Sequence, residues 1–97
     1  MPYCCTYDVP APVAMYREVK RRLGEEAPDG LLVHLVVQVD GGLRHIEVWT
    51  TETAWTRYHD ERVEPIVHDL LRDAGFTEMP PDPPMTSFDV VDLQVGA

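Results

Sequence analysis

The sequence predicts an α+β sandwich in which a four-stranded antiparallel sheet carries two helices on one face. Three observations support this class: apolar residues recur at helical spacing in two stretches, a hairpin signal lies between two β-rich stretches, and a β-rich stretch lies near each end. The chain has 97 residues, so we assign residues 1–97 to a single domain.

The first half of the chain predicts a strand, a helix and a second strand. Residues 2–7 include Tyr, Cys and Thr, which favour strands, and a turn containing proline follows. Over 12–23 the apolar residues recur every three or four positions, as in an amphipathic helix, and Gly24 suits its C-terminal cap. After a polar loop, the uninterrupted β-rich stretch 31–39 predicts the second strand.

A hairpin joins this strand to a third strand, predicted at 43–51. The link is Asp-Gly-Gly at 40–42, and a short link that contains glycine between two β-rich stretches is a strong hairpin signal. A two-residue loop formed by the two glycines would pair His34 with Trp49, whereas a three-residue loop would pair Val33 with Trp49. The sequence leaves both registers open.

The second half predicts one long helix and a last strand. The helical period extends over 55–74, with Thr50 or Thr51 as N-terminal cap. Pro65 interrupts it, and because a proline inside a helix removes one hydrogen bond, we expect a kink or a restart near Glu64. A proline-rich extended segment follows, and then a fourth strand at 86–95.

The order β-α-β-β-α-β, with a hairpin in the middle and two crossovers, is that of a ferredoxin-like sandwich. Its helices cover one face of the sheet, yet both alternate sets of side chains in 31–39 are mostly apolar. We therefore expect a second copy of the chain to cover the other face by packing sheet against sheet, on a patch that includes Leu32, Val36 and their neighbours on the third strand.

Composition and charge exclude several classes of function. Hydrophobic residues make up 44% and charged residues 26%, as in an ordinary globular protein. The net charge of −9 repels phosphate backbones and anionic lipids, so we expect no nucleic-acid or membrane partner, and we interpret the basic cluster at 17–22 as a solvated helix face. Without a signal sequence we expect a cytoplasmic protein, in which the adjacent Cys4 and Cys5 are reduced thiols.

His34 is the best single candidate for chemistry. It is the only strongly polar residue in the first eight of its strand, where burial is expected and an unsatisfied imidazole would be costly. It could contact a ligand or act as a general base. The alternative is a histidine of the core or the dimer interface that donates to a carbonyl or carboxylate.

On the third strand, alternation places His45, Glu47 and Trp49 on one face. Glu47 could be a general base, or a partly exposed carboxylate that pairs with His45 or with an arginine of the partner chain. Whether His34 joins this face depends on the hairpin register.

Aromatic residues near the end of the third strand and the start of the long helix could wall a cavity. Trp49, Trp55 and Tyr58 are spaced for this role, although aromatics at such spacing also form ordinary cores. Tyr3 and Tyr7 could reach the same space from the first strand, but alternation alone does not determine their face.

Four segments carry a resemblance to a known family: Gly-Leu-Leu-Val-His at 30–34, Asp-Gly-Gly at 40–42, Ile-Glu-Val-Trp-Thr-Thr-Glu-Thr-Ala-Trp at 46–55 and Asp-Glu-Arg-Val-Glu-Pro at 60–65. The chain resembles, over nearly its whole length, the dimeric α/β-barrel superfamily, and within it small actinobacterial proteins similar to antibiotic-biosynthesis monooxygenases. The resemblance implies the ferredoxin-like fold and a homodimer.

The superfamily includes cofactor-independent quinone-forming oxygenases, haem degraders, dismutases, isomerases, cyclases and members without known activity. Haem degraders use an Asn with an aromatic residue and a His, and this chain has no Asn. It also lacks a dinucleotide fingerprint, a P-loop and paired Cys motifs, so we expect no cofactor and no metal.

The sequence and the resemblance together predict a cofactor-independent oxygenase- or cyclase-like protein of secondary metabolism. It would act on a small aromatic or polycyclic metabolite in a pocket between sheet and helices, with His34 or Glu47 as proton acceptor and His45, Trp49, Trp55, Tyr58 and Tyr3 as binding residues. The alternative is a non-catalytic homodimeric ligand-binding or assembly module. A third hypothesis, a metal-dependent enzyme that uses His34, His45 and Glu47, requires the first hairpin register.

Overall fold

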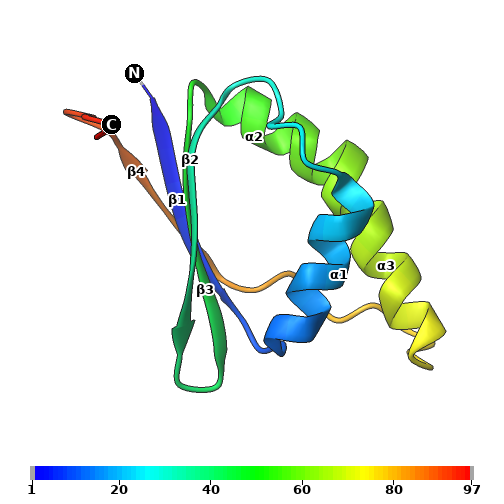
Figure 1. Ribbon diagram of the computed structural model, residues 1–97. Coiled ribbons are helices and arrows are strands. Elements are labelled where there is room, and N and C mark those ends of the chain that lie inside the picture. Colours follow the sequence, from blue (N-terminus) through cyan, green and yellow to red (C-terminus); the bar gives the residue numbers. More distant parts are fainter. Residues whose placement is uncertain (1, 97) are drawn as a thin grey trace.

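The computed structural model describes residues 2–96 and contains one antiparallel sheet with helices on one face (Figure 1). Its elements are β1 (Tyr3–Val9), α1 (Val13–Leu23), β2 (Leu31–Val39), β3 (Gly42–Trp49), α2 (Glu52–Tyr58), the π-helical turn η1 (His59–Val63), α3 (Glu64–Asp73) and β4 (Met85–Asp89). The strand order is β2-β3-β1-β4, and every neighbouring pair is antiparallel. This confirms the predicted ferredoxin-like α+β fold.

The hairpin between β2 and β3 has a register that the sequence analysis did not consider. Val39 pairs with Gly42, so the loop is Asp40-Gly41, and His34 lies opposite Glu47 instead of opposite Trp49. Both predicted registers are wrong, because Gly41 supplies the positive φ of 85° that a tight two-residue loop requires. Gly42 is thereby free to begin β3.

The register differs from the first predicted one by two residues, so it preserves the alternation of side chains. His34 therefore shares a face of the sheet with Glu47. At the start of β2 the pairing shifts by one residue between Leu31 and Val33, and Leu32 at this irregularity is exposed.

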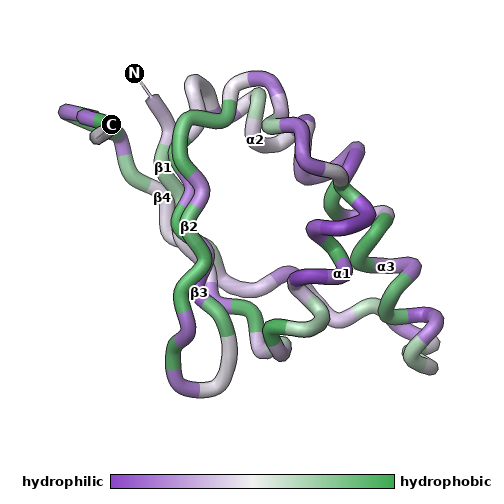
Figure 2. The backbone as a smooth tube through the Cα atoms, in the orientation of Figure 1, coloured by the Kyte–Doolittle hydropathy of each residue, from purple (hydrophilic) through white to green (hydrophobic). Residues whose placement is uncertain are grey.

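The face of the sheet away from the helices is apolar and uncovered. Leu35, Val37 and Phe88 are exposed there, and β2 is largely apolar along its length (Figure 2). The predicted association patch is wrong at Val36 and at its neighbour on β3, because Val36 pairs with His45 and both lie on the face toward the helices. Leu32 is exposed, as predicted.

The long helix runs from α2 through η1 into α3 and changes its winding at η1. Thr51 begins it by accepting a hydrogen bond on Oγ1 from the Ala54 N–H at 3.1 Å. The irregularity predicted near Glu64 is a π-helical turn, in which the Glu64 N–H donates to the His59 carbonyl. Pro65 follows in the first turn of α3, where its missing N–H is tolerated.

The strands at the two ends differ from their predicted limits. β1 continues to Val9 because it pairs with β3 as far as Leu43. β4 ends at Asp89, not at residue 95, because its partner strand β1 begins at Tyr3, which pairs with Asp89. Beyond that point the Val90 N–H still donates to the Pro2 carbonyl at 3.2 Å, but Pro2 has no N–H with which to continue the ladder.

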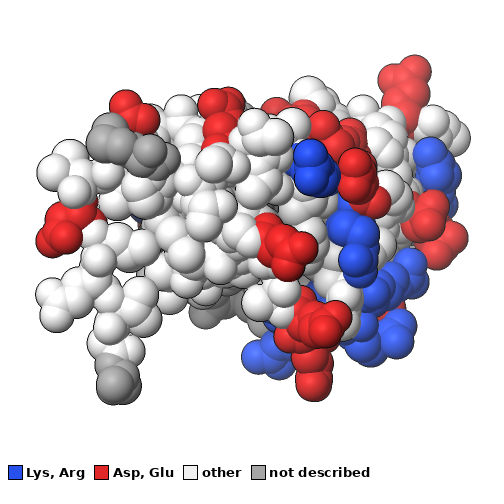
Figure 3. Space-filling model, turned by 90° about the horizontal axis from the view of Figure 1, so that it is seen from above, with Lys and Arg blue, Asp and Glu red and all other residues white. Residues whose placement is uncertain are grey.

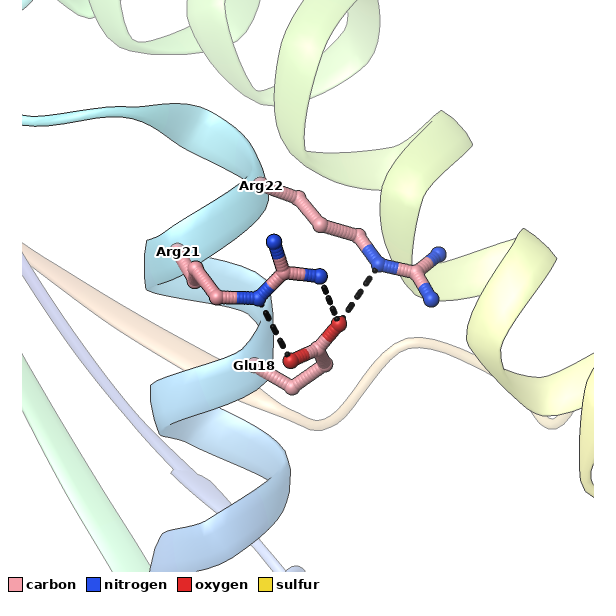
Figure 4. A network of polar contacts seen from close by, with 3 residues as sticks. All are labelled: Glu18, Arg21 and Arg22. Atoms are coloured by element: carbon pink, nitrogen blue, oxygen red, sulfur yellow. Dashed lines mark hydrogen bonds and ion pairs between the residues drawn. The ribbon is translucent and has the colours of Figure 1, made fainter.

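Charged side chains gather over the helices, whereas the sheet end of the molecule is largely uncharged in the view of Figure 3. On α1, Arg21 and Arg22 both donate to Glu18 (Figure 4), and these hydrogen bonds lower the pKa of Glu18 to about 2. Two residues of the basic cluster are thus paired within their own helix. None of the helices in the described part of the chain has the length and apolar character that crossing a bilayer requires.

Candidate functional site

A cluster of polar and aromatic side chains lies on the face of the sheet that the helices cover. Strand pairing brings it together: Glu47 lies beside His34 on one side and beside Cys5 on the other, and His45 lies beside Tyr7. The four side chains that can exchange protons or hydrogen bonds, Tyr7, His34, His45 and Glu47, therefore come from three adjacent strands.

Glu47 is a buried carboxylate, with 6% of its surface exposed. The Tyr7 hydroxyl donates to Oε2 at 2.7 Å, and the indole Nε1 of Trp49 donates to Oε1 at 3.2 Å. A buried charge is tolerated only when hydrogen bonds satisfy it, and here each carboxylate oxygen has a donor. Burial and the neighbouring Glu47 raise the pKa of Tyr7, so its phenol stays protonated and remains a donor.

His34 and His45 form a pair of imidazoles beside this carboxylate. His34 Nε2 lies 3.2 Å from His45 Nδ1, so one ring donates a hydrogen bond to the other. The Tyr7 ring stacks on His45 with a centroid distance of 4.8 Å and an interplanar angle of 5°. Tyr16, on α1, presents an edge to His45 at 5.5 Å, which places the pair between sheet and helix.

Burial lowers the pKa of both histidines. Glu47 acts in the opposite direction on each, while Lys20 further lowers the pKa of His34 and the His34 ring further lowers that of His45. The two imidazoles are therefore mainly neutral at pH 7, and a nitrogen lone pair is available to accept a proton.

The same cluster contains the donor types of a metal site. One ligand atom from each of His34, His45 and Glu47 lies within 4.8 Å of the other two. These atoms are already bonded within the protein, because both oxygens of Glu47 accept hydrogen bonds and the imidazoles bond to each other. The group is thus satisfied without an ion.

The predicted aromatic residues lie in the same layer as this cluster, between the sheet and α2. The rings of Trp49 and Tyr58 are 5.5 Å apart and tilted by 41°, and those of Tyr3 and Trp55 are 6.1 Å apart and tilted by 47°. Trp49 is fully buried, so it serves the core as well as the carboxylate. The Tyr3 hydroxyl is buried and has no hydrogen-bond partner among residues 2–96.

Tyr16 was not among the predicted site residues, and Tyr7 was named only as a residue that could reach the cavity if its face allowed. Tyr7 has the same strand parity as Tyr3, and Tyr16 lies in the apolar stripe of α1, which a helix turns toward its sheet. The sequence alone shows both that Tyr3 and Tyr7 share one face of their strand and that Tyr16 belongs to the apolar face of its helix. The missing information was which sheet face the helices cover.

Two surface hollows lie away from this cluster, on the long helix. One, of about 330 Å³, is lined by Asp60, Glu64, Pro65, His68, Asp69 and Arg72. The other, of about 350 Å³, is lined by Glu52, Thr53, Thr56, Arg57, Asp60 and Glu61. Neither includes a predicted site residue. No residue of α1, α2, η1 or α3 is buried, however, so the helix layer is not sealed against the sheet.

Comparison with known proteins gives fold-level matches only. No family model and no curated protein matches the sequence. A crystal structure of a mutant of MhuD with two manganese protoporphyrin IX bound per active site has a TM-score of 0.50 and 18% identity, with 100% of each chain covered.

Two further structures match less well. One is the heme-degrader MhuD from Mycobacterium tuberculosis with two hemes bound, with a TM-score of 0.46, 20% identity, and 99% of this chain and 100% of that chain covered. The other is a candidate antibiotic-biosynthesis monooxygenase from Bacillus cereus, with a TM-score of 0.41, 17% identity, and 99% and 95% covered. The chain thus has a ferredoxin-like fold, and it shares this fold with MhuD.

Proposed function

We propose that this protein binds a small aromatic or polycyclic metabolite between sheet and helices and acts on it as a cofactor-independent oxygenase or cyclase. The observation that carries the proposal is the pair of partly buried imidazoles, whose ring nitrogens lie 3.2 Å apart, beside the buried carboxylate of Glu47. A neutral imidazole is a suitable acceptor for the proton of a phenol or an enol at neutral pH.

In this mechanism His34 takes the hydroxyl proton of the substrate, and the hydrogen bond to His45 shares the resulting positive charge. Glu47 stabilises the imidazolium, since it favours the charged form of both rings. Glu47 is also the alternative acceptor, although it must then release the donors that hold it. The proton transfer leaves an electron-rich enolate or phenolate on the substrate.

The enolate can react with dioxygen or with itself. At a ring methylene, one oxygen atom of dioxygen becomes the new carbonyl, and the other leaves as water with the two hydrogens of that carbon. In a cyclase, the carbanion instead attacks a carbonyl of the same molecule. Tyr3, Trp55 and Tyr58 would contact the flat ring system, and the buried Tyr3 hydroxyl, which has no hydrogen-bond partner among residues 2–96, would supply a donor for a substrate oxygen.

The proposal includes a homodimer. Leu35 and Phe88 are 52% and 54% exposed on the face away from the helices, and a second copy that packs sheet against sheet would cover both. We also propose that the dimer is cytoplasmic.

A non-catalytic homodimeric ligand-binding or assembly module is the second candidate function. Two observations favour it. Each oxygen of Glu47 already accepts a hydrogen bond, and the two hollows described above lie on the long helix, away from the cluster. In that case the polar network only fixes the strands and the aromatics only fill the core.

Two measurements test the leading proposal. Native mass spectrometry of the protein as purified should give a dimer that carries an organic adduct. Titration with 4-nitrophenol, a phenol acidic enough to ionise near neutral pH, should give saturable binding and increase the yellow absorption of the nitrophenolate ion, because the bound phenol loses its proton to His34. His34→Ala should remove this increase, and Glu47→Gln should weaken it by about tenfold, on the order of one lost charge interaction.

His68→Ala is the matched control, since it removes an imidazole on α3 outside the cluster. It should bind and ionise 4-nitrophenol like the unmodified protein. Equal nitrophenolate signals in all three variants would remove the proton-transfer mechanism, and binding without any increase in nitrophenolate would favour the module.

A further inference from the structure

A second group of metal-ligating side chains lies outside the sheet cluster, on the long helix. His59, Asp60 and Glu64 each offer one ligand atom, and these atoms lie within 4.8 Å of one another. We propose that these three residues form a surface site for Zn²⁺. The proposal is independent of the function proposed for the sheet cluster.

The π-helical turn is what brings the three residues together. In an ordinary α-helix, side chains four positions apart share a face, whereas those five apart diverge. In η1 the hydrogen bond runs from the Glu64 N–H to the His59 carbonyl, so the wider turn places residue 64 above residue 59. Asp60 and Glu64 are four apart, and all three therefore converge on one side of the helix.

The sequence did not indicate this group because His59 and His68 do not have the spacing of a helical metal pair. The one feature of the sequence that marks the irregular turn is Pro65, which lies in the first turn of α3, just after the π turn. π-helical turns occur frequently at functional sites, and here the turn exchanges an ordinary helical register for one in which an imidazole and two carboxylates meet.

The side chains are placed and charged as a zinc site requires. His59 stacks on Trp55 with a centroid distance of 5.1 Å, and its Nδ1 lies 3.4 Å from Asp60 Oδ1. Glu64 Oε1 lies 3.5 Å from His68 Nε2, so His68 can orient the carboxylate from behind. An imidazole and two carboxylates suit Zn²⁺, and water completes the tetrahedron.

Access and charge also favour a cation. Asp60 and Glu64 line the hollow of about 330 Å³ on the helix surface. Arg72 lines the same hollow, but it pairs with Asp69 at 3.2 Å, so its charge is partly balanced. These ligands are less buried than the sheet cluster, and their side chains can contract onto an ion without disturbing the core.

Isothermal titration calorimetry of the full chain with Zn²⁺, in the presence of a reductant that binds no metal, tests the site. We expect one Zn²⁺ per chain. His59→Ala and Glu64→Gln should each raise the dissociation constant at least tenfold, on the order of one lost ligand. His34→Ala, which removes a ligand atom from the only other such group in residues 2–96, should change it less than twofold.

Three results would overturn the proposal: no binding by the unmodified chain, normal binding by both His59→Ala and Glu64→Gln, or loss of binding in His34→Ala. If a variant loses its helical circular dichroism, NMR of the unmodified protein decides. Zn²⁺ should then shift the imidazole signals of His59 and leave those of His34 and His45 in place, and the reverse pattern rejects the site.

Discussion

The two faces of the sheet are made by the same strands but have different chemistry. The face toward the helices carries a buried carboxylate, two imidazoles and a fully buried indole. The opposite face carries exposed apolar side chains, with the exposed Asp8–Arg44 ion pair at one end. Strand alternation thus places a polar network on one face and exposed apolar side chains on the other. The buried charge of Glu47 is tolerated because hydrogen-bond donors satisfy both of its oxygens.

The largest expected difference between the faces is in packing. Trp49→Ala should lower the free energy of unfolding by about 3–5 kcal/mol, because it opens a cavity at a fully buried position and removes a donor from Glu47. Urea unfolding at one fixed protein concentration measures the change. Phe88→Ala, on the opposite face, is the matched control and should have a much smaller effect in dilute protein. Equal losses in both variants would mean that the two faces are packed alike.

The fold could be predicted because its signals are local. The Asp-Gly-Gly link and the apolar spacing of the first helix determined the order of the elements, and Pro65 marked the irregular turn. The hairpin register could not be predicted, because the choice between loops that differ by one residue depends on how Gly41 and Gly42 divide between turn and strand. The end of β4 is set by its pairing with the first residue of β1, and the sequence of β4 alone does not show which residues pair.

A smaller effect is expected from a single hydrogen bond on the covered face. Tyr7→Phe should lower the free energy of unfolding by about 1.5–3 kcal/mol, since it leaves a buried carboxylate oxygen of Glu47 without its 2.7 Å donor. Asp8→Asn is the control. It weakens the exposed ion pair between Asp8 and Arg44 on the other face, which water already solvates, so its effect on the free energy of unfolding should be much smaller. A Tyr7→Phe protein as stable as the unmodified chain would show that Glu47 is not held by this bond.

The candidate site was predictable in composition but not in its connections. His34, His45, Glu47 and Trp49 could be named because polar residues stand out in β-rich stretches. That Tyr7 and Trp49 each donate to one oxygen of Glu47 could not be foreseen, since it requires the register on both sides of β3. The group of His59, Asp60 and Glu64 was missed because a π turn has no simple sequence period.

The smallest expected effect is on the pH dependence of stability. Burial lowers the folded-state pKa of His34 and His45 below the ordinary value of 6.5, although Glu47 opposes the shift and Lys20 adds to it for His34. Between the folded-state pKa and 6.5 the unfolded chain therefore binds more protons than the native protein, so the free energy of unfolding rises with pH in that window and levels off above it.

Urea unfolding at pH 7.5 and at pH 5.5 measures this loss. The double variant His34→Gln, His45→Gln should lose less stability on acidification than the unmodified protein. His68→Gln, on α3, should keep the full dependence. The Tyr7 and Tyr16 hydroxyls, which also face the pair, stay protonated at both pH values because burial raises the pKa of each. If the double variant retains the full pH dependence, the histidines are solvated, and the contrast between the two faces does not extend to their protonation.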